Sequence, residues 1–156
     1  MTVKVLDIPL LSLVNTASVK IIVNLCDCFN NICSKTSLDI RGTFPGSYAA
    51  QLLRQKGDRH KLGTIDHSYE KNCLIFNAYI NYDFNDVSLG KEIFDPTMLI
   101  SCFMQMQDII DWYSLGDFDI CFTYNNFLKF NMLLTDVTAV LTYMDHYVTN
   151  DIMLLV

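Results

Sequence analysis

Four short, almost uninterrupted apolar runs constrain this chain more than any other feature of its sequence. They cover residues 19–25, 74–80, 118–122 and 152–156. Continuous apolar character of this kind is typical of strands covered on both faces, as in the interior of a parallel sheet. Residues 2–8 instead alternate apolar and polar side chains, which is the pattern of a half-exposed edge strand. We therefore predict four central strands and one edge strand.

Segments with helical period lie between these runs. In residues 96–113 apolar side chains recur on one face, behind Asp95 as the N-cap and Pro96 at the first helical position. Residues 135–148 repeat the pattern and are opened by Thr135 or a neighbour. A shorter helical region lies within residues 35–56, where the Phe-Pro-Gly run at 44–46 interrupts it.

Strands and helices thus alternate along most of the chain. This order predicts an α/β fold of three layers, in which helices cover both faces of a mixed, mostly parallel central sheet. No repeat or linker breaks the pattern, so we expect residues 1–156 to form a single domain. Ligands of such sheets bind at the carboxyl ends of the strands, which points to the loops at residues 26–35, 81–95 and 123–134.

The charge distribution limits the kinds of partner. The chain has a formal net charge of −6, and residues 92–156 contain Lys129 as their sole base. This argues against a general nucleic-acid binder, which needs clustered Lys and Arg to neutralise phosphates. One basic run, RQKGDRHK at residues 54–61, is the exception. We interpret it as a solvated helix end and loop in preference to an anion-binding surface.

Other functional classes have little support. The longest uncharged stretch, residues 96–107, is well short of the roughly 20 apolar residues that a bilayer requires. The N-terminus lacks a cleavable leader pattern, so an intracellular protein with reduced cysteines is expected. Cys26, Cys28 and Cys33 do not have the spacing of common zinc sites, and no histidine is arranged as the base of a nucleophile. We predict no metal and no cofactor.

Five motifs, in this order, resemble the macro domain, an ADP-ribose-binding α/β module, in the compact form found in phage and viral genomes. The motifs are VLDI at residues 5–8, CDCFNN at 26–31, FPGSYAA at 44–50, KLGTI at 61–65 and NAYINY at 77–82. The resemblance spans most of the chain. It implies ADP-ribose or a related nucleotide as the ligand.

The resemblance also implies site residues. Asp7, followed by Ile8, is similar to the family residue that recognises the adenine amino group, although it is equally explained as a turn residue that ends the strand. Asp27 stands where the family has an asparagine that contacts the distal ribose. There a carboxylate would act as a general base if its pKa were raised, or would repel an anionic ligand. Asn31 and Asn81 complete the polar set.

The chain departs from the family at the two loops that hold the diphosphate. Such loops need glycine, because only glycine permits the close approach of backbone N–H groups to phosphate. The first loop reads NICSKTS at residues 31–37 and the second TYNNFLKFNM at 123–132, and neither contains glycine. Two interpretations remain. Either the side chains of Phe127, Phe130 and Met132 fill the ligand pocket, or the ammonium groups of Lys35 and Lys129 bind an anion through their charge.

The leading prediction is a non-catalytic, macro-like binding protein, an accessory factor of the viral or phage type. It would act through a protein partner or self-association, with Tyr124, Phe127 and Phe130 forming an exposed apolar patch. The alternative is a binder of ADP-ribose or a related nucleotide, with residual ADP-ribose phosphatase or de-ADP-ribosylating activity at Asp7, Asp27, Asn31, Lys35 and Asn81. The residues make no strong case for an enzyme.

Overall fold

One six-stranded sheet organises the computed structural model, which describes residues 3–156. The strand order is β1-β6-β5-β2-β4-β3, and every neighbouring pair is parallel except β3 and β4. The strands are β1 (Lys4–Leu6), β2 (Ile21–Asp27), β3 (Ile65–Glu70), β4 (Cys73–Asn81), β5 (Ile120–Thr123) and β6 (Ile152–Leu155). The predicted mixed, mostly parallel sheet is therefore confirmed.

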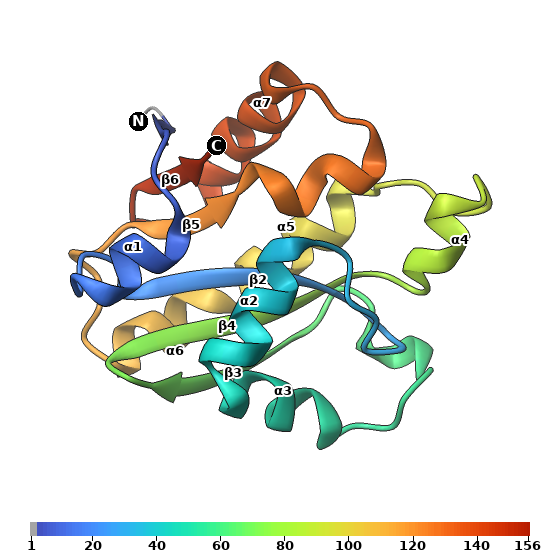
Figure 1. Ribbon diagram of the computed structural model, residues 1–156, viewed down its shortest axis with the longest axis horizontal. Coiled ribbons are helices and arrows are strands. Elements are labelled where there is room, and N and C mark those ends of the chain that lie inside the picture. Colours follow the sequence, from blue (N-terminus) through green and yellow to red (C-terminus); the bar gives the residue numbers. More distant parts are fainter. Residues whose placement is uncertain (1–2) are drawn as a thin grey trace.

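Helices cover both faces of the sheet (Figure 1). The helices are α1 (Leu10–Asn15), α2 (Lys35–Thr43), α3 (Pro45–Leu52), α4 (Phe84–Ser88), α5 (Pro96–Met104), α6 (Met106–Trp112) and α7 (Leu134–Met144). The connections between these elements contain the 3₁₀ helices η1 (Arg59–Lys61), η2 (Tyr124–Phe130) and η3 (Asp145–Tyr147). In Figure 1 α1 and α2 lie in front of the sheet, whereas α5 and α6 lie behind it. The three predicted layers are thus present.

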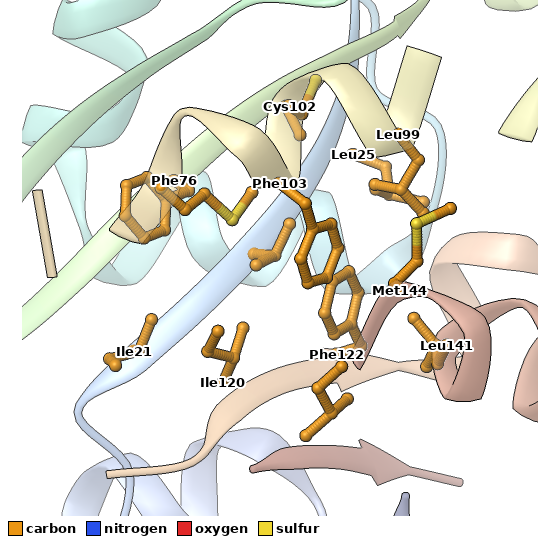
Figure 2. Packing of buried hydrophobic residues seen from close by; sticks show 14 of the residues in the cluster. Ile21, Leu25, Phe76, Leu99, Cys102, Phe103, Ile120, Phe122, Leu141 and Met144 are labelled. Carbon is orange, nitrogen blue, oxygen red and sulfur yellow. The ribbon is translucent and has the colours of Figure 1, made fainter. Parts of the chain in front are cut away.

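The larger core lies between the sheet and the helices α5, α6 and α7. The Phe103 ring stacks on the Phe122 ring, with centroids 5.6 Å apart and planes within 5° of parallel, as Figure 2 shows. Both side chains are completely buried, as are Leu141 and Met144 of α7. A smaller core on the opposite face joins Leu10 of α1 to residues of α2 and the sheet. Every residue of β2 is buried, so its continuous apolar run belongs, as predicted, to a strand that is covered on both faces.

All five predicted strands are confirmed, and Thr2, in the predicted edge strand, lies outside the described residues. The strand β3 was not predicted. It pairs with β4 in a hairpin whose two turn residues, Lys71 and Asn72, have φ of 52° and 59°. Two consecutive positive φ values are typical of a type I′ turn, usually formed by Asn-Gly or Asp-Gly. The Lys-Asn pair carries that signal only weakly.

The predicted helix at residues 96–113 is divided into α5 and α6 at Gln105. The Asp95 side chain accepts a hydrogen bond from Thr97 N at 2.9 Å, so the predicted N-cap is confirmed. At the break, Gln105 Nε2 donates to Gly63 O at 2.7 Å and thereby ties the helix pair to the loop before β3. The helix α7 begins one residue before Thr135, and the Asp136 carboxylate accepts from Leu133 N at 3.0 Å.

None of the helices in residues 3–156 is both long and apolar enough to cross a membrane.

The aromatic stack of the larger core gives a stability prediction. We expect Phe122→Ala to lower the free energy of unfolding by about 3 to 5 kcal/mol, because it removes a buried ring and leaves a cavity. Urea denaturation followed by circular dichroism measures the change. Trp112→Ala is the control, since the Trp112 side chain is 81% exposed, and should change the free energy by less than about 0.5 kcal/mol. A loss below about 1 kcal/mol for Phe122→Ala would contradict the assigned core.

Candidate functional site

The two glycine-free loops meet at the sheet edge where β2, β5 and β6 end. The Ser34 hydroxyl, which caps α2, donates to Asn126 Oδ1 at 2.6 Å. Thr36 N in the first turn of α2 donates to Asn125 Oδ1 at 3.1 Å, and Thr123 Oγ1 donates to the Thr36 hydroxyl at 2.9 Å. The sequence reasoning placed the two loops together, and the structure joins them by direct side-chain hydrogen bonds.

These hydrogen bonds occupy two of the donors at the start of α2. The first N–H groups of a helix have no partner within the helix and are therefore a ready-made anion site. Here Asn125 Oδ1 accepts from Thr36 N, and the Ser34 hydroxyl accepts from Ser37 N at 3.1 Å. Side-chain oxygens of the protein thus take two of the positions that the oxygens of an anion would take.

The asparagine pair of the second loop is buried to different extents. Asn126 is completely buried, and its Oδ1 also accepts from the Ser37 hydroxyl at 3.4 Å, while its Nδ2 has no hydrogen-bond partner within residues 3–156. Asn125 is half-buried. The sequence analysis overlooked both residues. The signal was present, because two adjacent asparagines directly follow the end of an apolar strand, where side-chain amides commonly bond to nearby backbone.

The two candidate lysines have separate partners. The Lys35 side chain is 76% exposed and forms an ion pair of 2.8 Å with Asp39, one helical turn further along α2. Lys129 Nζ lies 5.6 Å from the centroid of the Phe84 ring. An exposed ion pair such as Lys35–Asp39 contributes little stability and leaves the Lys35 ammonium group in solvent.

A hollow of about 200 Å³ lies beside the start of α2. Ile8 and Lys35 are in its lining, together with Thr36, Asn125 and Val156. Asp7 follows β1 and is exposed, outside this lining. Of the predicted ligand residues, the structure therefore brings Ile8 and Lys35 into one concave surface and leaves Asp7 beside it.

The Asp27 carboxylate is a buried hydrogen-bond acceptor that joins two segments, the loop after β2 and the start of α4. Its Oδ1 accepts from Phe29 N at 3.1 Å and from Asn31 N at 2.9 Å. Its Oδ2 accepts from Asn31 Nδ2 and from Phe84 N, each at 2.8 Å. Burial raises the pKa of the Asp27 carboxyl, and the hydrogen bonds act in the opposite direction. Both carboxylate oxygens therefore accept hydrogen bonds from the protein, which fix the loop after β2 against the start of α4.

The candidate asparagines also turn toward the protein. Asn31 Nδ2 bridges Asp27 and Asp83, the second at 3.2 Å. Asn81 is buried at the end of β4, and its Nδ2 donates to Ile93 O at 3.0 Å, which fixes the loop before α5. Its Oδ1 is buried without a hydrogen-bond partner among the described residues.

The predicted patch of exposed aromatic side chains is wrong for its central member. Phe127 is completely buried, where its ring lies 6.0 Å from Phe94 and 6.3 Å from Phe122. Phe130 is half-buried against Phe94, and the Tyr124 hydroxyl donates to Met132 O at 2.7 Å. The 3₁₀ turns of η2 direct the aromatic rings inward and leave Leu128 49% exposed. Leu128 is therefore the exposed apolar side chain of η2, and the polar Asn131 that follows is exposed as well.

The cysteines provide neither a metal site nor an activated thiol. All six are free thiols, and among residues 3–156 no three His, Cys, Asp or Glu side chains are grouped so as to hold a metal ion. Burial raises the pKa of Cys28 to about 11 and that of Cys102 to about 12. Burial also raises the pKa of the Cys33 thiol, whose Sγ lies 3.1 Å from Ser37 Oγ. These thiols remain protonated near neutral pH and are weak nucleophiles.

Comparison with solved structures identifies the fold. The chain is similar to the macrodomain of Mycobacterium tuberculosis DarG, with a TM-score of 0.71 and 11% sequence identity over 99% of this chain and 97% of that one. It is also similar to the macrodomain of Thermus aquaticus DarG, with a TM-score of 0.67 and 12% identity over 99% of this chain and 98% of that one. No protein-family model and no curated protein sequence matches the chain.

The chain has a macrodomain fold. The likeness covers nearly the whole of both chains, so the resemblance inferred from the five sequence motifs is confirmed at the level of the fold. At such low identity the residues of the site have to be judged by their own geometry.

The buried Asp27 carboxylate gives the prediction for this site. In Asp27→Asn the amide Nδ2 would face two donors, Asn31 Nδ2 and Phe84 N, so we expect the free energy of unfolding to fall by about 2 to 4 kcal/mol. Urea denaturation measures it. Asp39→Asn removes a carboxylate from an exposed ion pair and should cost less than about 0.5 kcal/mol. Equal effects of the two substitutions would show that Asp27 has no special structural role.

Proposed function

We propose that this chain is a non-catalytic binding protein of the macrodomain fold, which does not hold the diphosphate of ADP-ribose and acts through protein contacts. The proposal rests on two hydrogen bonds at the start of α2, in which Thr36 N donates to Asn125 Oδ1 and Ser37 N donates to the Ser34 hydroxyl. A diphosphate at this place would have to displace those side-chain oxygens. It would gain charge-assisted hydrogen bonds but leave the displaced amide and hydroxyl groups to find new partners.

The side chains of the first loop add a steric argument. Cys33 and Lys35 stand where glycines would let the backbone approach a phosphate, and each adds a Cβ atom to that surface. Cys33 Sγ lies within 3.9 Å of Asn126 Oδ1, so the two loops also pack against each other. Without an open backbone cradle, Lys35, which is paired with Asp39, and Lys129 remain to attract an anion by charge.

The second part of the proposal concerns an apolar surface between η2 and the start of α7. Leu128, Leu133 and Leu134, which we call the leucine surface, are 49%, 66% and 37% exposed. Large apolar side chains that gather on one exposed segment are typical of contact surfaces. A second copy of the chain is the partner that can be tested first. Membership of a viral or phage accessory class rests on the sequence resemblance alone and belongs to the same proposal.

A nucleotide binder is the second candidate, favoured by the hollow that Ile8 and Lys35 line. In this alternative the nucleotide would use Asp7 and the residues of the hollow, with Asp27, Asn31 and Asn81 supporting the loops. Any residual hydrolytic activity would have to use a group other than the fully bonded Asp27 carboxylate.

Isothermal titration with ADP-ribose distinguishes the two candidates. We expect no heat of binding at millimolar ligand from a sample that unfolds cooperatively, because the α2 donors are already bonded. We expect the triple substitution Cys33→Gly, Lys35→Gly and Asn125→Gly to gain measurable affinity, because it frees Thr36 N and opens the loop. Micromolar binding to the unaltered protein, lost in Asp7→Ala, would instead establish the nucleotide binder.

Sedimentation velocity tests the leucine surface. We expect the unaltered protein to show concentration-dependent association and the double substitution Leu128→Ser and Leu133→Ser to weaken it about ten-fold or more, because it removes apolar contact area. Leu53→Ser is the matched control, since Leu53 is 86% exposed at the end of α3, outside the leucine surface. A monomer at all concentrations, or an equal effect of the control, would remove self-association through these leucines from the proposal.

A further inference from the structure

A second concave surface lies outside the two macrodomain loops. It is a cleft of about 560 Å³ between the loop after β2 and the end of α3, lined by residues 29–31, Tyr48 and residues 52–56. We call it the basic cleft. In Figure 1 the loop after β2 runs next to the segment that joins α3 to β3, and the hydrogen bond from Gly57 N to Cys28 O connects the two segments. Of the two glycine-free loops, only Asn31 contributes to the lining.

The lining of the basic cleft is positively charged, whereas the chain as a whole is negatively charged. Its lining contains Arg54 and Lys56 but no Asp or Glu, although the chain as a whole carries −6. Residues 41–61 hold five bases, Arg41, Arg54, Lys56, Arg59 and Lys61, against Asp58 as the only acid. Local charge of one sign in a concave surface focuses the electrostatic potential and attracts ligands of the opposite sign.

A buried ammonium group lies directly behind the wall. Lys61 is completely buried, and its Nζ donates to Asn30 Oδ1 at 3.3 Å and to Cys28 O at 3.4 Å. No carboxylate within residues 3–156 forms an ion pair with it. Buried charges are normally paired, so this one leaves positive potential beside Asn30, which lines the cleft. The prediction that the whole run 54–61 is solvated was therefore wrong for Lys61.

The walls are held in place before any ligand arrives. Gly57 N donates to Cys28 O at 2.7 Å and joins the two walls. Arg41 lies 3.9 Å from the centroid of the Tyr48 ring and donates to Asn30 O at 2.9 Å. Asn30 itself has a φ of 59°, a conformation that asparagine tolerates and that turns the loop at this point. A preformed site loses less conformational entropy on binding.

The remaining lining groups are amides and rings. Asn30, Asn31 and Gln55 offer both donors and acceptors, and Phe29 and Tyr48 are half-buried. Such a set suits a ligand that has a polar heterocycle or sugar as well as a charge. The volume lies within the range of sites for small organic molecules, roughly 300 to 1,000 Å³, and is far larger than one inorganic phosphate needs.

We propose that the basic cleft binds a nucleoside monophosphate, with the phosphate at Arg54 and Lys56 and the nucleoside along the amide and aromatic wall. Lys56 provides an exposed ammonium, and Arg54 provides a planar guanidinium whose Nη2 lies 3.8 Å from Asp66 Oδ2. A phosphate would therefore meet the Lys56 charge directly and share the Arg54 guanidinium with Asp66. This site shares Asn31 with the residues considered for ADP-ribose, but the rest of its lining is different and it does not depend on the proposed function. Either proposal can fail alone.

Titration with 5′-AMP at low ionic strength, read by calorimetry and by backbone amide shifts, tests the proposal. We expect saturable binding with shifts at residues 29–31 and 52–56. We expect Lys56→Gln to weaken it about five-fold and Lys56→Glu to weaken it further, because the exposed charge is first removed and then reversed. Lys56 forms no side-chain hydrogen bond or ion pair within residues 3–156, so both variants should fold.

Lys35→Gln is the matched control, since it removes an exposed ammonium from the macrodomain loop. We expect it to leave 5′-AMP affinity unchanged. An equal loss in Lys35→Gln and Lys56→Gln, or shifts confined to the α2 start and η2, would overturn the proposal and place the nucleotide in the hollow beside α2. No binding at millimolar 5′-AMP would also overturn it. Inorganic phosphate and adenosine should each bind more weakly, and phosphate binding as tightly as 5′-AMP would reduce the cleft to a simple anion site.

Discussion

The buried carboxylate of Asp27 holds the ligand end of this molecule together. It accepts four hydrogen bonds from the loop that follows β2 and from the first residue of α4. An ionised group removed from water is tolerated only when such donors surround it. Because the same loop forms one wall of the basic cleft and leads into α2, the position of both surfaces depends on this acceptor.

The two glycine-free loops illustrate a general requirement of helix ends. The first donors of α2 need partners, and two of them find these partners in side-chain oxygens of the protein. Ser34 and Asn125 supply them, and the neighbouring Asn126 accepts from the cap residue. The fold is thereby complete without a ligand, which explains how a macrodomain fold can persist with loops of this composition.

Much of the fold could be predicted from the sequence, and the reasons for the misses are specific. The buried strands are readable because both faces are apolar, as in β2. The edge strand β3 was not predicted, because its sequence, IDHSYE, is half polar and the turn that joins it to β4 lacks glycine. The site was harder, because loop periodicity does not determine side-chain direction. Adjacent residues Phe127 and Leu128 are buried and exposed, respectively, and only the 3₁₀ path of η2 decides which.

Net charge and local charge answer different questions about what this chain can bind. An overall charge of −6 argues against clustered phosphate contacts along a nucleic acid, yet it says nothing about one concave surface of a few residues. Three bases near the basic cleft are immobilised: Arg41 stacks on Tyr48, Arg59 lies 3.7 Å from the Tyr82 ring, and Lys61 is buried. The lining itself contains Arg54 and the exposed Lys56 instead. In the proposed site the fixed cations would therefore add to the local positive potential, while Lys56 would make the direct contact with an anion.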